Sequence, residues 1–345
     1  GHTEEVLGVR FFPESARMLT WSKDGSAIIW DTASGVLLQR LVHSAGALSS
    51  ARVFPQGDRV VTCGAGGTCV VWDTEQGLAT GLVSTCIASK VEVFPCGDRL
   101  LTWGRSLMGL PTVWNLSSSK RVCAFRGHAI TVNTAAIFPA GDRVVTGSFD
   151  RMANIWSAPT CSLFHELPHP DWVTAVVVLK KGDIVGSTTS DGRTFLWSAD
   201  TGKLLRELES VSFTVADSIY EFKAFPRDQR LLTVNTRSAI VWDVVNGLPL
   251  SEFSSDAGWI YNAEVAPGGD TLVTCSGDRI QIWDAMSGAM LQEFQVEGVP
   301  VVNHPFGPLP VECLVAVGIG SSIDPQGFGR GLPWRDLPKS RMALA

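Results

Sequence analysis

Tryptophan recurs along this chain at a nearly constant spacing. A Trp-Asp pair occurs four times, and in three further places the Trp is followed by Asn or Ser; successive members of this set are 41 to 45 residues apart. The set is Trp30, Trp72, Trp114, Trp156, Trp197, Trp242 and Trp283. A fixed period of this length predicts an array of similar units, each burying its apolar face against its neighbours. The period therefore overrides the one or two unrelated domains that a length of 345 residues would suggest.

Each period holds the same order of strand and turn signals. Phe-Pro, or a degenerate copy of it, is followed by a polar turn and an apolar strand that ends in Thr or Ser, as in residues 141–146. A tight turn such as Lys23-Asp24-Gly25 comes next, then the strand that ends in the repeated Trp, then a Gly turn and a last strand. Four short strands in each unit, with no helical period between them, predict an all-β fold.

These landmarks keep one phase over residues 1–298 and are similar to those of the WD-repeat family. The resemblance implies a β-propeller of four-stranded antiparallel blades, with seven blades expected. Residues 299–323 resemble a worn unit without its Trp, so they form either a cap over the ring seam or a partial eighth blade, and eight blades is the alternative. Residues 324–345 are rich in Gly and Pro and are expected to be a linker or tail. The outer strand of the seventh unit is expected at residues 289–295.

The resemblance also implies a hydrogen-bonded network in each unit. The Trp indole donates to a Ser or Thr hydroxyl, the hydroxyl bonds a His, and a turn Asp orients that His. Complete sets are His2, Thr20, Asp24 and Trp30; His128, Thr146, Asp150 and Trp156; and His169, Ser187, Asp191 and Trp197. Partial sets are His43, Thr62 and Trp72; Thr102 and Trp114; Thr233 and Trp242; and Thr274, Asp278 and Trp283. Because the Asp, His and hydroxyl recur at one phase, whereas a hydrolase triad is a single constellation, they are interpreted as scaffolding, and no catalytic residue is assigned.

Charge and cysteine usage narrow the class of partner and the compartment. The net charge is −6 and no Lys/Arg cluster dominates, which argues against nucleic acid, and no apolar run reaches membrane-spanning length. The eight cysteines form no CxxC pair, so no metal and no cofactor is predicted. Dispersed among Val and Thr, they are expected to be reduced, partly buried thiols, which favours an intracellular, cytoplasmic location, with the nucleus as an alternative. Trp21 and Trp103 are expected to pack between blades.

One set of repeat positions differs between units. The resemblance places the third and fifth residues after the unit-start His, and the residue before the turn Asp, on one exposed face. Units four to seven carry aromatic residues at these positions, and units one to three carry smaller or polar ones. Since Trp and Tyr are rigid, amphipathic contact residues, they predict a partner-binding arc. The arc is Phe149, Trp172, Tyr220, Trp259 and Tyr261, with Glu5 and Lys23 at its edge. The alternative is that some of these rings pack between blades or fill the channel.

The sequence thus predicts a non-catalytic scaffold that binds a protein or peptide on one propeller face, within a multiprotein complex or a larger chain. One alternative is a substrate-recruiting adaptor module of a larger multidomain protein, of the ubiquitin-ligase or signalling type. A remote alternative is a propeller enzyme, which would need acidic residues or a metal site at the channel.

Overall fold

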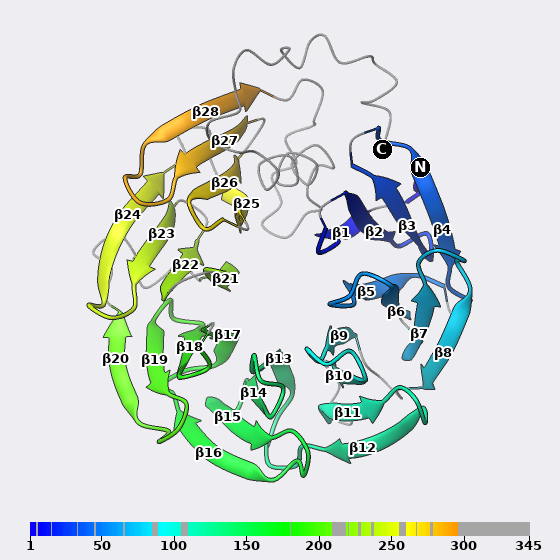
Figure 1. The fold of residues 1–345 in the computed structure, drawn as a ribbon. Helices are drawn as coiled ribbons and strands as arrows, with labels where there is room; N and C mark the ends of the chain where they lie inside the picture. The colour runs from blue at the N-terminus through cyan, green and yellow to red at the C-terminus, as the bar shows by residue number, and fades with distance from the viewer. Residues whose placement is uncertain are drawn as a thin grey trace.

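The computed structural model describes residues 1–295 except 5, 15, 33, 45, 65, 85–88, 105–109, 180, 209–218, 220, 227–228, 236–237, 255–259, 267 and 277–278. Within this part the strands β1 to β28 form seven four-stranded antiparallel sheets, each paired in chain order. Figure 1 shows these sheets as blades, side by side around a ring. The prediction of an all-β propeller with seven blades is confirmed. The predicted partial blade at 299–323 and the tail at 324–345 lie outside the described residues.

Each blade, numbered in chain order, contributes one strand to each of four positions between the centre and the rim (Figure 1). The innermost strands are β1 (Val6–Phe11), β5 (Leu48–Val53), β9 (Lys90–Val93), β13 (Val132–Ile137), β17 (Val173–Val178), β21 (Glu221–Ala224) and β25 (Ile260–Val265). The second strands are β2 (Arg17–Ser22), β6 (Arg59–Gly64), β10 (Arg99–Trp103), β14 (Arg143–Ser148), β18 (Ile184–Thr189), β22 (Arg230–Val234) and β26 (Thr271–Ser276). The third strands are β3 (Ser26–Asp31), β7 (Thr68–Asp73), β11 (Thr112–Asn115), β15 (Met152–Ser157), β19 (Thr194–Ser198), β23 (Ser238–Asp243) and β27 (Arg279–Asp284). The outermost strands are β4 (Leu37–Val42), β8 (Ala79–Ser84), β12 (Lys120–Ala124), β16 (Leu163–Pro168), β20 (Leu204–Leu208), β24 (Leu248–Ser254) and β28 (Met290–Gln295). The last of these confirms the outer strand expected at 289–295.

Apolar side chains from neighbouring blades form the core. Trp21 and Trp103 are 6% and 4% exposed and pack in clusters that span blades one and two, and blades three and four. A Cβ atom at Gly8 would lie 2.2 Å from the Trp21 ring, so only glycine leaves room for this indole. The predicted packing of both tryptophans between blades is confirmed.

A second contact between blades repeats at the Phe-Pro corners. In five blades an Arg at the start of the second strand lies over the Phe ring of its own corner, 4.3 to 4.5 Å from the centroid. The same guanidinium donates to a Gly carbonyl in the next blade. The Arg and Gly pairs are Arg17 and Gly57, Arg59 and Gly97, Arg99 and Gly141, Arg143 and Gly182, and Arg230 and Gly269. We call this combination of an Arg–Phe contact and an Arg-to-carbonyl hydrogen bond the latch. In blade five Leu179 and Ile184 replace the Phe and the Arg, so the latch toward blade six is absent.

The expectation of reduced thiols is wrong for four cysteines. Cys63 and Cys69 stand opposite each other in the β6–β7 ladder and form a disulfide. Cys123 of β12 forms a disulfide with Cys161, in the turn before β16, and joins blade three to blade four. Neither pair has a recognisable sequence spacing, because one depends on strand register and the other on contact between blades. Cys96 is free and exposed.

Candidate partner-binding face

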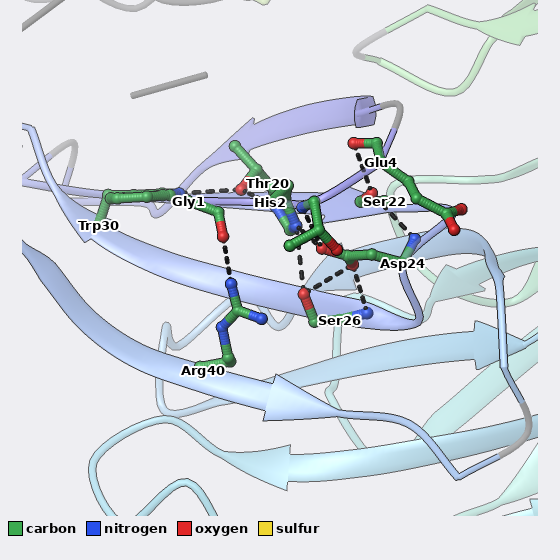
Figure 2. A network of polar contacts seen from close by, with 10 residues as sticks. Gly1, His2, Glu4, Thr20, Ser22, Asp24, Ser26, Trp30 and Arg40 are labelled. Carbon is green, nitrogen blue, oxygen red and sulfur yellow. Dashed lines mark hydrogen bonds and ion pairs between the residues drawn. The ribbon is translucent and has the colours of Figure 1, made fainter. Parts of the chain in front are cut away.

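His2 in blade one is held between a hydroxyl and a carboxylate (Figure 2). Its Nε2 lies 2.8 Å from Thr20 Oγ1, and its Nδ1 lies 3.0 Å from Asp24 Oδ2. The Trp30 indole donates to the same Thr20 oxygen over 2.9 Å. Because the Asp24 carboxylate only accepts, Nδ1–H donates to it, and Nε2 of the neutral imidazole then accepts from the Thr20 hydroxyl. Burial lowers the pKa of His2, although Asp24 opposes this effect, so the imidazole is neutral.

Blade four repeats this geometry, and part of it is present throughout the ring. His128 Nδ1 lies 2.9 Å from Asp150, its Nε2 lies 2.7 Å from Thr146, and Trp156 donates to Thr146 over 2.8 Å. An indole-to-hydroxyl bond of 2.8 to 2.9 Å occurs in all seven blades. The bonds in the other blades are Trp72 to Thr62, Trp114 to Thr102, Trp197 to Ser187, Trp242 to Thr233, and Trp283 to Thr274. Asp278 lies outside the described residues.

Blade five departs from the predicted set at Asp191. His169 bonds Ser187 as expected, but its Nδ1 donates to the Leu167 carbonyl rather than to Asp191. Asp191 instead forms an ion pair with Arg193 over 2.7 Å.

Proline accounts for part of this difference in blade five. Asp24 and Asp150 each accept a backbone N–H from the residue after the network histidine, Thr3 and Ala129 respectively. Pro170 has this place in blade five and carries no N–H, so one of the bonds that would hold Asp191 there cannot form.

The network histidines and hydroxyls are closed to substrates. Thr20, Thr146 and Ser187 are buried, and each hydroxyl is shared between an indole and a histidine. His43 in blade two is also buried, and burial lowers its pKa. Within the described residues, no group of three or more His, Cys, Asp or Glu side chains could hold a metal ion. The geometry therefore supports a scaffolding role for the network.

The turns between second and third strands, together with the segments leading into the innermost strands, form what we call the His–Asp face. On it, Phe149 from the β14–β15 turn meets Trp172, which directly precedes β17 of the next blade. The ring centroids are 5.5 Å apart and the planes are tilted by 52°. Trp172 is 54% exposed, and Phe149 is partly buried. The pair thus bridges blades four and five and leaves an indole in solvent.

The other members of the predicted arc are placed less fully. Glu5, Tyr220 and Trp259 lie outside the described residues, and Tyr261 lies in β25 with its side chain outside the description. Lys23 is exposed in the β2–β3 turn of blade one, and blades two and three lie between it and blade four. Of the seven predicted residues, the described structure brings Phe149 and Trp172 into contact.

The fifth repeat position has a structural role that periodicity alone did not show. Five innermost strands carry a β-bulge whose extra residue is at this position. These residues are Leu7, Ser49, Asn133, Thr174 and Tyr261. Ser49 and Thr174 donate within their own blades, to the Cys63 and Thr188 carbonyls, whereas Asn133 donates to the Thr174 carbonyl of the next blade.

Two neighbours of the aromatic pair were not predicted. Ile130 is 47% exposed, and its carbonyl accepts from Ser148, the residue before Phe149. Arg151 is exposed two residues after Phe149 on the same turn. In the sequence, Arg151 directly follows the turn Asp; blades one and five have glycine at that place, and blade seven has Arg279.

Comparison with known proteins identifies the repeat in three stretches of the chain. Residues 1–31, 35–73 and 119–157 match the family model described as WD domain, G-beta repeat. No curated protein matches the chain. The matched stretches hold the Trp-ending strands of blades one, two and four, and the remaining blades share their four-stranded order and their indole-to-hydroxyl bond. These three matched repeats and the seven-bladed ring are consistent with the WD-repeat family of β-propellers.

Proposed function

We propose that this chain is a scaffold that binds a protein or peptide partner on its His–Asp face, with Phe149 and Trp172 at the centre of the contact. Propellers of this family generally mediate protein–protein interaction. The observation that carries the proposal is that Trp172 is 54% exposed although its ring contacts Phe149 of the neighbouring blade. A rigid indole that is already held in place on one side loses little conformational entropy when a partner covers its other side.

The surroundings of the pair favour a compact contact site. Ile130, in the segment that leads into β13, is 47% exposed, and its carbonyl accepts from Ser148, the residue before Phe149. Backbone hydrogen bonds fix the two turns: Phe149 N donates to Thr131 O, and Ser190 N donates to Trp172 O. Partners bind more tightly to surfaces whose geometry exists before they arrive.

Binding without catalysis is the activity that we infer. The hydroxyls of the network are buried, and on two innermost strands a glutamate pairs with a cation of the neighbouring blade. Arg52 pairs with Glu92 over 2.9 Å, and Lys223 pairs with Glu264. Within the described residues, these two carboxylates form ion pairs that join neighbouring blades, which supports a non-catalytic role for the chain.

Affinity capture with matched aromatic variants tests the proposal. Trp172→Ala and Phe149→Ala are compared with wild type and with Phe164→Ala, which removes a 52% exposed ring from the outer strand of blade four. We expect Trp172→Ala to lose a partner that both wild type and Phe164→Ala retain, and the loss to be reproduced with that partner purified. Identical partner sets for all four proteins, each with an unchanged thermal midpoint, would refute this site.

The compartment stays a prediction. Among the described residues, none of the structure forms a helix long and apolar enough to cross a membrane. The intracellular location was inferred from reduced cysteines, and the two disulfides remove that support. A role as an adaptor within a larger assembly is compatible with the same contact face, and the captured partners would identify that assembly.

A further inference from the structure

Arg151 has a backbone conformation that disfavours its residue type. In blades one, two, four and five, the turn that joins the second and third strands has a left-handed residue next to the position of the turn Asp. In blades one, two and five this residue is Gly25, Gly67 and Gly192, with φ of 78°, 78° and 83°. In blade four it is Arg151, with φ of 68°. Glycine adopts this region without a steric penalty, whereas a residue with a Cβ is strained there.

The fold does not require arginine at this turn. In blade one the carbonyl of Gly25 accepts a hydrogen bond from His43 N over 2.9 Å. In blade four the carbonyl of Arg151 accepts the same bond from His169 N, also over 2.9 Å. Glycine therefore performs the backbone role equally well, and what Arg151 adds is its side chain. A residue held in a strained backbone conformation without a backbone reason points to a function for its side chain.

The Arg151 guanidinium is placed for an outside partner. Arg151 is exposed and forms no ion pair or side-chain hydrogen bond with any residue in the described part of the chain. The comparison is Arg193 in the matching turn of blade five, which pairs with Asp191 and Glu207.

Asp150 precedes Arg151 in the chain and Asp171 precedes Trp172, and both carboxylates are already bound within the fold. Asp150 accepts from His128 and from Ala129 N. Asp171 accepts from Ser190 Oγ and from Trp172 N. Their oxygens are directed to these donors, so Arg151 keeps its capacity to bind an incoming carboxylate.

We propose that Arg151 selects partners in which an Asp or Glu lies close to an apolar or aromatic side chain. The apolar side chain packs on Phe149 and Trp172, and the carboxylate accepts two parallel N–H bonds from Arg151. A planar guanidinium matches a carboxylate in this way, and the match supplies direction as well as attraction. This inference rests on the proposed function, because it assigns a partner chemistry to the same face.

Peptide display on the intact chain tests this selectivity. A library of random 12-residue linear peptides is selected in parallel on wild type, Arg151→Gly and Trp172→Ala. We expect wild type to enrich Asp or Glu within a few positions of a Trp, Phe or Leu. Arg151→Gly introduces the residue that blades one, two and five have at this position, so its thermal midpoint stays equal or rises, and its peptides keep the apolar residue but lose the acidic one. Trp172→Ala is expected to lose the enriched peptides altogether.

A double-mutant cycle then measures the contact. We take a peptide that was selected on the wild-type protein and replace its acidic residue by the matching amide. Binding to the wild-type protein is expected to weaken by about 10- to 100-fold, which is the usual range for a hydrogen-bonded charge. On Arg151→Gly the same replacement changes nothing, and Arg151→Lys gives an intermediate loss. Equal losses on wild type and Arg151→Gly would overturn the assignment to Arg151.

The remaining outcomes separate this inference from the proposed function. Peptides that depend on Trp172 but show no acidic preference refute the role of Arg151 and leave the binding face intact. Selected peptides that are indifferent to Trp172 refute the binding face itself. If a peptide bound only when its acidic residue was replaced by phosphoserine, the partner would be a phosphopeptide, and the carboxylate assignment would be wrong.

Discussion

The Arg143 guanidinium lies 4.4 Å from the centroid of the Phe138 ring and donates from Nη2 to the Gly182 carbonyl of the next blade. One side chain thus combines a cation–π contact within its blade with a charged hydrogen bond to a neighbour. Its second bond, from Nη1 to the Ala199 carbonyl, reaches the same neighbour. Repetition of this arrangement at five corners makes it a main polar contribution to blade stacking.

Arg143→Ala should therefore lower the free energy of unfolding by about 2 kcal/mol, since cation–π contacts and charged hydrogen bonds each contribute about 1 to 2 kcal/mol. Urea unfolding followed by tryptophan fluorescence measures the change. Arg279→Ala is the control, because Arg279 forms a surface pair with Glu293 and such pairs contribute at most about 1 kcal/mol. Equal losses in the two variants would contradict the latch.

Removing the network hydroxyl should cost a different amount of stability in different blades. Thr146→Val leaves both the Trp156 indole and His128 Nε2 without their partner, whereas Thr233→Val leaves the Trp242 indole, and the chain has no histidine at the start of that unit. A buried polar group left without a partner costs about 1 to 3 kcal/mol. We expect Thr146→Val to lose about twice as much stability as Thr233→Val in chemical denaturation. A larger loss for Thr233→Val would argue that His128 gains nothing from the hydroxyl.

Buried neutral histidines make the propeller sensitive to acid. Burial lowers the pKa of His169 from 6.5 to about 4, and burial also lowers the pKa values of His2, His43 and His128. Between pH 6.5 and about 4 the unfolded chain binds more protons at His169 than the fold does, so stability falls as the pH is lowered through this window. His169 alone accounts for a loss of up to about 3 kcal/mol.

Urea midpoints at pH 7 and pH 5 measure this dependence. His169→Gln keeps a polar side chain without a titrating group, so its midpoint should change less between the two pH values than that of wild type. Trp172→Ala, outside the network, should change as wild type does. A steeper dependence in His169→Gln would show that His169 is not neutral in the fold.

The periodicity of the sequence was sufficient for the fold, because blade position, strand order and the tryptophan packing all follow from one repeat. The hydrogen-bond partners of individual side chains within a repeat were harder to predict from the sequence. Asp191 was predicted to bond His169 because it has the right phase, yet Pro170 removes a donor and Arg193 supplies a stronger partner. Both residues are visible in the sequence, but their effect depends on side-chain directions that a phase argument does not contain.

On the binding face, too, some features follow from the repeat and others depend on the folded structure. Phase arithmetic selected Phe149 and Trp172, which meet across a blade joint, because their repeat positions lie at one end of every blade. It did not select Arg151, because the left-handed φ that this arginine shares with Gly25 and Gly192 is a property of the folded turn. It also missed both disulfides, since strand register and contact between blades are properties of the folded ring.

The two disulfides should contribute unequally to stability. Cys123 and Cys161 close a loop with a sequence separation of 38, and Cys63 and Cys69 one with a separation of 6. In the chain-entropy model the longer loop stabilises the fold by about 4 kcal/mol and the shorter by about 2 kcal/mol. We therefore expect the double variant Cys123→Ser/Cys161→Ser to unfold at a lower urea concentration than Cys63→Ser/Cys69→Ser.

Adding a reductant should lower the urea midpoint of wild type to that of the variant lacking both pairs. Mass spectrometry after alkylation should show all four thiols protected before reduction. Thiols that alkylate freely in the native protein would contradict the bonds, and equal midpoints for the two double variants would contradict the loop-length argument.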